Sequence, residues 1–248
     1  MPITHKFYDK QWEGGFQTQN GILISEHYKP EVLFLGTFNP DTHGNHNLAT
    51  FFYGRSKYFW PVLHSIFNLQ APYNQVPPYD NLIWPLCINL KLSFADLIAN
   101  VIPNVPNQHI QQNENNIIFN NQDYNLLGDA DLIALDAIGQ VSWNTDSIIE
   151  FINNTPTLKY IYLTQTSNNL FSNKFNFIKQ QCQRDDIVFR KIYTPTGRSL
   201  PGIPRPTFLA MQWLITQAIQ QPQNGFSIAW LHGYNIHSFN FPPYSLHF

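Results

Sequence analysis

The chain has 248 residues, of which 43% are hydrophobic, 15% aromatic and only 12% charged. This composition excludes an intrinsically disordered chain, and the length provides for one sizeable hydrophobic core. The formal net charge of −2 disfavours a protein that coats nucleic acid, since phosphate neutralisation supplies much of such binding. A small local nucleic-acid footprint stays open, because four of the five arginines fall in or beside two segments described below: Arg55, Arg190, Arg198 and Arg205.

The first third of the chain predicts one strand and one helix. Residues 1–30 predict an irregular N-terminal leader. Glu31–Gly36 is a short apolar run that ends in glycine, which is typical of a buried parallel strand. After a polar loop, apolar residues recur at helical spacing up to residue 67. Because proline is accepted only in the first turn of a helix, Pro61 predicts a helix start at about Lys57–Tyr58.

The middle of the chain gives weaker signals. Residues 70–130 are rich in Pro, Asn and Gln, and they contain one short apolar island at Phe94–Ile98. Asp131–Asp136 predicts a strand. Thr145–Phe151 predicts a short helix with Thr145 as its N-cap.

Strands and helices alternate most clearly in the last third. Leu158–Leu163 and Asp186–Tyr193 predict strands. The segments after them predict two helices, with apolar faces formed by Phe171, Phe175, Ile178 and Cys182 and within Pro206–Ile219. This alternation predicts an α/β domain over residues 31–220, with a mostly parallel sheet covered by helices. Residues 221–248 form an aromatic-rich tail that we expect to pack on the same domain.

Nothing in the sequence predicts a secreted or membrane protein. The N-terminus lacks a signal-peptide pattern, and no apolar run approaches membrane-spanning length. Cys87 and Cys182 lie in apolar stretches without metal or redox spacing, which indicates buried free thiols. We expect a soluble protein in the cytoplasm, or in the nucleus of a eukaryote.

Two loops stand out at the carboxyl ends of the predicted strands, where open α/β sheets bind ligands. They are GTFNPDTHG after the first strand and TPTGRS after the last. The string LFLGTFNP, followed by FFYGRSKYFW, resembles the first motif of the uracil-DNA glycosylase superfamily. The similarity is to the branch with mismatch-specific thymine/uracil and deoxyinosine/hypoxanthine glycosylases. Weaker similarities follow in the family's order over residues 31–215: SFADLI at 93–98, TPTLKYIYLTQTS at 155–167 and TPTGRS at 194–199.

The resemblance implies a three-layer α/β sandwich and a set of site residues. It assigns Asn39 to positioning the attacking water. The branch has one residue between the glycine and the asparagine, whereas Thr37 and Phe38 both intervene here, so Asp41 is a rival water activator. The base-binding residues implied are Gly36, Thr37, Phe38, Pro40, Phe52 and Tyr53. The DNA-binding residues implied are Gly54, Arg55, Lys57, Thr194, Pro195, Thr196, Gly197, Arg198 and Ser199. For Asp96, within SFADLI, we favour a loop or helix cap over the alternative of a catalytic acid.

These residue types suit base excision. A base inside a duplex is out of reach, so such enzymes extrude the nucleotide and stack the base on an aromatic ring. Phe38, Phe52 and Tyr53 are candidates for that platform, which is worth about 1–3 kcal/mol per stacked base. The resemblance implies a monomer that acts on damaged DNA without metal or cofactor.

Two functions follow as hypotheses. The first is a monofunctional DNA glycosylase that releases a deaminated base, uracil or hypoxanthine. The second is a catalytically inactive nucleic-acid or nucleobase-binding module on the same fold, because fold and function separate easily. A serine hydrolase or a dinucleotide-binding domain lacks support, since neither GxSxG nor a phosphate-binding glycine-rich loop occurs.

Overall fold

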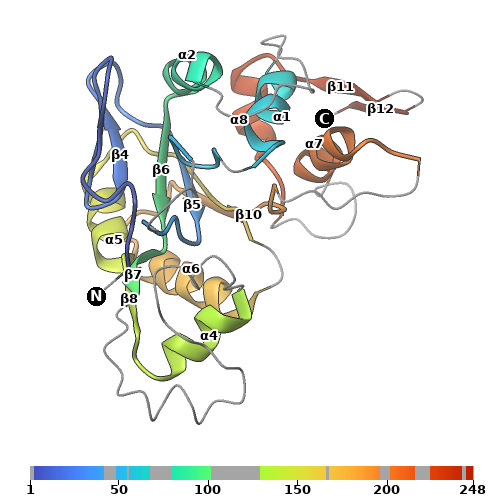
Figure 1. Ribbon diagram of the computed structural model, residues 1–248. Helices are drawn as coiled ribbons and strands as arrows, with labels where there is room; N and C mark the ends of the chain where they lie inside the picture. Colours follow the sequence, from blue (N-terminus) through green and yellow to red (C-terminus); the bar gives the residue numbers. More distant parts are fainter. Residues whose placement is uncertain are drawn as a thin grey trace.

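A four-stranded parallel sheet forms the centre of the molecule (Figure 1). The computed structural model describes residues 3–41, 49–54, 56–67, 80–101, 129–165, 168–195, 202–215, 224–241 and 244–247. The strands are β5 (Val32–Gly36), β6 (Leu92–Asp96), β9 (Tyr160–Leu163) and β10 (Val188–Lys191), in the order β10-β9-β5-β6. All three pairings are parallel. Every residue of β5 is buried, as expected for a strand covered on both faces.

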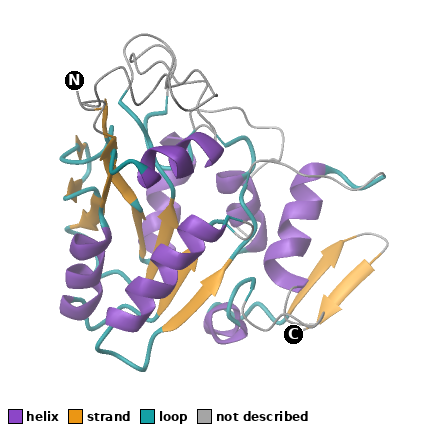
Figure 2. Cartoon of the chain, turned by 90° about the horizontal axis from the view of Figure 1, so that it is seen from below, coloured by secondary structure: helices purple, strands orange, loops and turns teal. Residues whose placement is uncertain are grey.

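Helices cover both faces of this sheet, so the predicted α/β architecture with a parallel sheet is confirmed. Val32 and Phe34 of β5 point into one core, whereas Leu33 and Leu35 point into the other. The first core is completed by α1 (Phe59–Ile66), α2 (Asp80–Leu90), α7 (Arg205–Ile215) and α8 (Ile228–Gly233). The second is completed by α4 (Asp129–Ala137), α5 (Thr145–Asn154) and α6 (Asn169–Gln181). Figure 2 shows the central strands between these helices.

The strand order creates a crevice at one end of the sheet. From β5 the chain moves to its neighbour β6 and then returns to β9 on the other side of β5. Connections that leave neighbouring strands in opposite directions separate the loops at their carboxyl ends, and open α/β sheets bind ligands there. The fold therefore points to the loops that follow β5 and β9.

The N-terminal segment is not the irregular leader that the sequence predicts. Three short antiparallel strands form a meander: β2 (Gln11–Trp12), β3 (Phe16–Gln19) and β4 (Ile22–Ser25). Strand β1 (Ile3–Thr4) pairs with β7 (Ile98–Val101), which pairs with β8 (Val141–Trp143). Strands of two to four residues are too short to show a period. The one local signal is Asn20-Gly21, whose two positive φ angles make the turn between β3 and β4.

Three further expectations for the middle of the chain need correction. The segment predicted as a strand at 131–136 belongs to helix α4, because Leu132 and Leu135 are buried three positions apart while Ile133 is 43% exposed. Helix α2 lies in the region expected to be least regular, and Pro85 inside it obscures its helical pattern. The N-cap of α5 is Asn144 and not Thr145, which is the first helical residue.

The C-terminal tail packs on the same core as helix α1. It contains α8 and a hairpin of β11 (Ser238–Phe241) and β12 (Tyr244–His247). Phe226 and Trp230 are buried against Phe34 of the central sheet. Among the described residues, no helix has the length and apolar character needed to cross a membrane.

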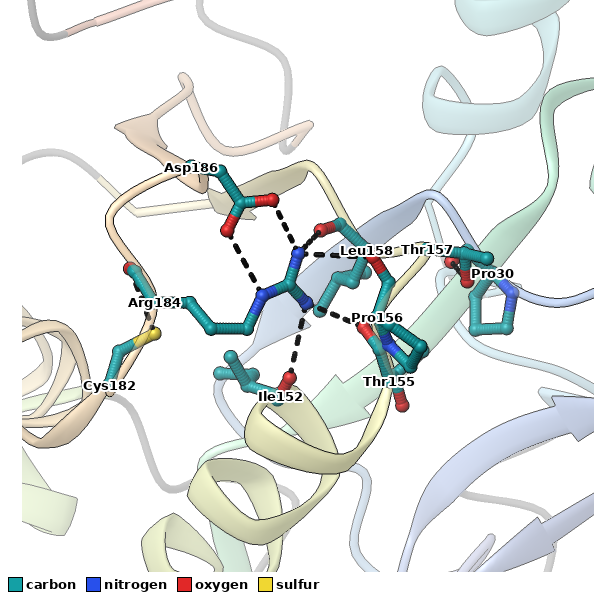
Figure 3. Close-up of polar contacts among 9 residues, drawn as sticks. All are labelled: Pro30, Ile152, Thr155, Pro156, Thr157, Leu158, Cys182, Arg184 and Asp186. Atoms are coloured by element: carbon teal, nitrogen blue, oxygen red, sulfur yellow. Dashed lines mark hydrogen bonds and ion pairs between the residues drawn. The ribbon is translucent and has the colours of Figure 1, made fainter.

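Arg184 ties together the loops at the amino ends of β9 and β10 (Figure 3). Its guanidinium donates hydrogen bonds to the backbone carbonyls of Thr155 (2.6 Å), Pro156 (3.1 Å) and Leu158 (2.9 Å), which follow helix α5. It also donates from Nε and Nη2 to both carboxylate oxygens of Asp186, at 3.0 and 2.7 Å. The Thr155 carbonyl also accepts the Leu158 N–H at 3.1 Å. The guanidinium therefore reinforces this turn before β9 and joins it to Asp186 before β10.

We expect Arg184→Ala to lower the free energy of unfolding by about 2–3 kcal/mol, because hydrogen bonds from a charged donor contribute more than neutral ones. Arg184→Lys should retain only part of this stabilisation, because the lysine ammonium lacks the planar set of donors of a guanidinium. Urea denaturation measures both, with Lys179→Ala, an exposed cation on α6, as the control. Equal stability of Arg184→Ala and the control would show that the carbonyls do not need this side chain.

Candidate functional site

A cavity of about 440 Å³ lies at the carboxyl ends of β5, β9 and β10. This volume is in the range of small-ligand sites and is large enough for one nucleobase. The loops after all three strands contribute to its wall, together with the turn that precedes α1 and the last residue of β6. The described residues that line it are Gly36, Thr37, Phe38, Asn39, Tyr53, Ser56, Asp96, Thr164, Gln165, Thr194 and Pro195.

The structure brings together residues from both loops that the sequence singled out. From the loop after β5, the lining includes Gly36, Thr37, Phe38 and Asn39, and Tyr53 comes from the turn before α1. From the loop after β10, it includes Thr194 and Pro195. Arg55, Thr196, Gly197, Arg198 and Ser199 lie outside the described residues.

Phe52 and Pro40, predicted as base-binding residues, do not line the cavity. Phe52 is fully buried in the core, where it stacks on Phe94 at a centroid distance of 5.8 Å. The tight turn at Phe51–Gly54, closed by the Gly54 N–H to the Phe51 carbonyl (2.9 Å), sends Phe52 inward and leaves Tyr53 at the cavity. Pro40 is buried and forms a β-bridge with His5.

Three polar or turn-forming candidates also fall outside the cavity wall. Asp41 is exposed, and its backbone N–H donates to the Thr4 carbonyl at 2.8 Å, so it is not placed as a water activator. Gly54 is buried, and a Cβ there would meet the Phe51 carbonyl at 2.9 Å, so the turn requires glycine. Lys57 is exposed next to the lining residue Ser56.

Asp96, interpreted as a cap from the sequence, is instead the centre of a buried hydrogen-bond network. Its side chain is 2% exposed, and its Oδ2 lies 2.7 Å from His5 Nε2 and 2.6 Å from Asn39 Nδ2. The backbone N–H of Phe7 donates to His5 Nδ1 at 3.0 Å, so the neutral ring carries its proton on Nε2 and donates it to Asp96. In the same way the amide of Asn39 must turn its NH₂ to the carboxylate, which leaves Oδ1 as an acceptor.

The N-terminal segment holds His5 and Asn39 in these positions. The N–H of His5 donates to the Ala99 carbonyl in β7 at 3.0 Å, and the N–H of Lys6 donates to the Asn39 carbonyl at 2.8 Å. The segment therefore lies between β7 and the loop after β5. Nothing in the sequence signals this contact, because His5 and Asp96 are 91 positions apart.

The loop after β5 turns backbone N–H groups away from β7. The carbonyls of Gly36 and Thr37 accept hydrogen bonds from the N–H groups of Leu97 (3.0 Å) and Ile98 (3.1 Å). In a planar trans peptide the N–H points opposite to the carbonyl of the same unit. The N–H groups of Thr37 and Phe38 are therefore directed away from Leu97 and Ile98, and both residues line the cavity.

Tyr53 and Thr164 form another part of the cavity wall. Thr164 Oγ1 donates to the Leu35 carbonyl (3.1 Å), which uses its one proton, so the Tyr53 hydroxyl is the donor in its 2.9 Å bond to Thr164. The Tyr53 ring stacks on Phe59 with a centroid distance of 4.0 Å. Burial and the negative charge of Asp96 raise the pKa of Tyr53 well above its ordinary value, so the phenol stays protonated at neutral pH.

Ser56 links the turn before α1 to the loop after β10, and both segments line the cavity. Its Oγ donates to the Pro195 carbonyl at 3.0 Å and accepts from the N–H groups of Tyr58 (3.3 Å) and Phe59 (3.2 Å) at the start of α1. One side chain thus accepts two N–H groups at the start of α1 and anchors the loop after β10. Sequence spacing alone did not indicate this role.

The comparisons with known proteins add no family. No family model, no curated protein and no solved structure matches the chain. Among the described residues, no group of three or more His, Cys, Asp or Glu side chains is arranged to hold a metal ion.

We expect Gly36→Ala to disrupt the network around Asp96, because a Cβ at this position would overlap the carboxylate Oδ1. The side chain of Asp96 would have to turn away from His5 and Asn39, at a cost of about 1–3 kcal/mol. Gly233→Ala, where a Cβ meets nothing within 4 Å, is the matched control. Unfolding free energies of the two variants that agree within error would contradict the packing described here.

The Tyr53 hydroxyl gives a second expectation, with a defined pH dependence. At pH 7, Tyr53→Phe loses the bond to Thr164 and about 1 kcal/mol of stability. Because the folded-state pKa of Tyr53 is raised, the contribution of the neutral phenol is fully present below the ordinary pKa of 10.0. It is lost as the pH rises above 10, where the unfolded chain ionises first. Unfolding free energies of wild type and variant should therefore converge above pH 10, and a constant difference up to pH 11 would contradict the assignment.

Proposed function

We propose that this protein is a DNA glycosylase-like enzyme that flips a deaminated base, uracil or hypoxanthine, out of DNA and hydrolyses its N-glycosidic bond. The observation that carries the proposal is the meeting of Phe38, Asn39 and the Thr194–Pro195 loop around one cavity of nucleobase size. The family resemblance of the first motif supports the same reading. The cavity also lies at the reversal of strand order, where ligands of α/β sheets bind.

Phe38 is the side chain best suited to stack a flipped base. It is half-buried at the cavity wall, beside the ring of His5 at a centroid distance of 6.0 Å. One face of the Tyr53 ring is already covered by Phe59, and Phe52 is in the core. Of the three aromatic residues predicted as the platform, Phe38 therefore has the strongest support.

A backbone donor favours a deaminated base. Deamination replaces the exocyclic amino group of cytosine or adenine with a carbonyl oxygen. The N–H group of Thr37, a lining residue, is directed away from Leu97, and it would match a carbonyl acceptor and oppose an amino donor. A site built to donate hydrogen bonds rejects a ligand that lacks the acceptor far more strongly than an apolar pocket rejects an extra group. The same donor would stabilise negative charge on the departing base.

Asn39 is the residue that would orient the attacking water. Its NH₂ group is committed to Asp96, so Oδ1 is left to accept a hydrogen bond from a water molecule. An amide takes no proton at neutral pH, and its contribution is therefore orientation of the nucleophile. This assignment keeps Asn39 and drops Asp41, which lies outside the cavity lining.

The test is base release from oligonucleotides that carry uracil or hypoxanthine, in single and double strands, followed by chromatography. We expect release by the wild type, and a rate at least about 100-fold lower for Asn39→Ala, as for other groups that act in the transition state. Tight lesion binding without release, unchanged by Asn39→Ala, would instead favour the inactive binding module. A wild-type protein that shows no base release and no lesion-dependent binding would contradict both functions.

Phe38→Ala should weaken binding of lesion-containing DNA about 5- to 150-fold, the equivalent of about 1–3 kcal/mol for one stacked base. Phe177→Ala, a 42% exposed phenylalanine on α6, is the matched control and should leave the Kd unchanged. The measurement is a fluorescence anisotropy titration at fixed salt concentration, since salt alone changes such affinities. Equal Kd values for Phe38→Ala and wild type would assign the platform to another residue.

A further inference from the structure

We infer that Asp96 is a catalytic residue of this site and that its carboxylate accepts the proton of the attacking water. The inference rests on the proposed function and adds a residue that the family resemblance did not assign. Among the described residues that line the cavity, Asp96 is the one carboxylate.

The two oxygens of Asp96 have different surroundings. Oδ2 receives both hydrogen bonds that the described side chains make to this carboxylate, from His5 and from Asn39. Oδ1 receives none from the described residues, and it lies against the Cα of Gly36 near the Tyr53 hydroxyl, both at the cavity wall. Since Tyr53 donates its proton to Thr164, it leaves Oδ1 available to a water molecule.

Burying the Asp96 carboxylate costs free energy, so its presence here suggests a functional role. A carboxylate that is 2% exposed loses most of its hydration, and two donors on one oxygen offset only part of that loss. An apolar residue at the end of β6 would fill the same place in the core without this cost. A buried carboxylate next to a fixed amide acceptor, in a cavity, is the arrangement expected of a group that handles a proton.

His5 is a positioning residue in this inference. Its Nε2–H fixes Oδ2, and its own ring is held by the Phe7 N–H and by the backbone bond to β7. It acts through Asp96, because it is not among the described lining residues of the cavity. The neutral ring with the proton on Nε2 is the form that these contacts require.

The reaction balances without a cofactor. Water held by Asn39 Oδ1 and Asp96 Oδ1 attacks C1′ of the flipped nucleotide. The C1′–N bond breaks and its electron pair leaves with the base, while the water oxygen forms the C1′–O bond. One proton passes from that water to Asp96 and on to solvent, and the base anion takes one proton from solvent. The net change adds OH to the sugar and H to the base.

The experiment compares single-turnover rates of base release with Kd values for the same DNA. We expect Asp96→Asn to lower the rate by a factor of about 100 to 10,000, the range for general base catalysis, while the Kd changes by less than about threefold. Asp9→Asn, an exposed carboxylate in the N-terminal segment, is the matched control and should match wild type in both. Added formate should restore part of the rate of Asp96→Ala, because it returns a carboxylate to the cavity.

Substitutions at His5 test the positioning role and keep the carboxylate in place. His5→Leu should lower the rate about 10- to 100-fold, the loss expected when a reacting group is misplaced, with an unchanged Kd. His5→Gln, whose amide can still donate to Asp96, should recover part of the lost rate. Nitrogen NMR of the wild-type imidazole should show the proton on Nε2, and a proton on Nδ1 would contradict the geometry.

The outcomes separate the two proposals. An active wild type with an equally active Asp96→Asn overturns the role of Asp96 and leaves the glycosylase proposal standing. A wild type that releases no base overturns the glycosylase proposal, and the role of Asp96 falls with it. If Asp96→Asn does not fold, as judged by circular dichroism, the His5 variants decide: wild-type rates in His5→Leu overturn the inference.

Discussion

The pairing of a single carboxylate oxygen with two donors holds the proposed site together. Asp96 Oδ2 joins the end of β6 to the N-terminal segment through His5 and to the loop after β5 through Asn39. A buried carboxylate without partners is so unfavourable that each of the three segments depends on the other two. Gly36 belongs to the same constraint, since its missing Cβ is the space that the second carboxylate oxygen occupies.

The two ends of the central sheet differ in their role: structural contacts gather at the amino ends of its strands, and the cavity lies at the carboxyl ends. At the amino ends of β9 and β10, Arg184 donates hydrogen bonds to backbone carbonyls and pairs with Asp186 (Figure 3). At the carboxyl ends, the reversal of strand order opens a space that side chains do not fill. A rigid strand beneath each loop fixes where the polar groups point, which a water-positioning site requires.

The polar groups around the cavity divide into donors and acceptors with different origins. The backbone donor is the N–H group of Thr37, which is directed away from Leu97 because the Gly36 carbonyl accepts the Leu97 N–H. The acceptors are side-chain oxygens of Asn39 and Asp96, fixed by each other and by His5. Neither set can rearrange without breaking a buried hydrogen bond, so the proposed site is organised before a ligand enters.

The sequence by itself determined the elements whose signals are local. The apolar run of β5, the periodic face of α1 and the alternation after residue 158 predict the parallel α/β layers, because burial imposes those patterns directly. The position of Phe38 and Asn39 at a strand end followed from the same reasoning. Only the tertiary structure decided that Tyr53 and not Phe52 reaches the cavity, that residues 131–136 are helical, and that His5 meets Asp96. These outcomes depend on contacts between residues far apart in the chain, and no local period or spacing encodes such contacts.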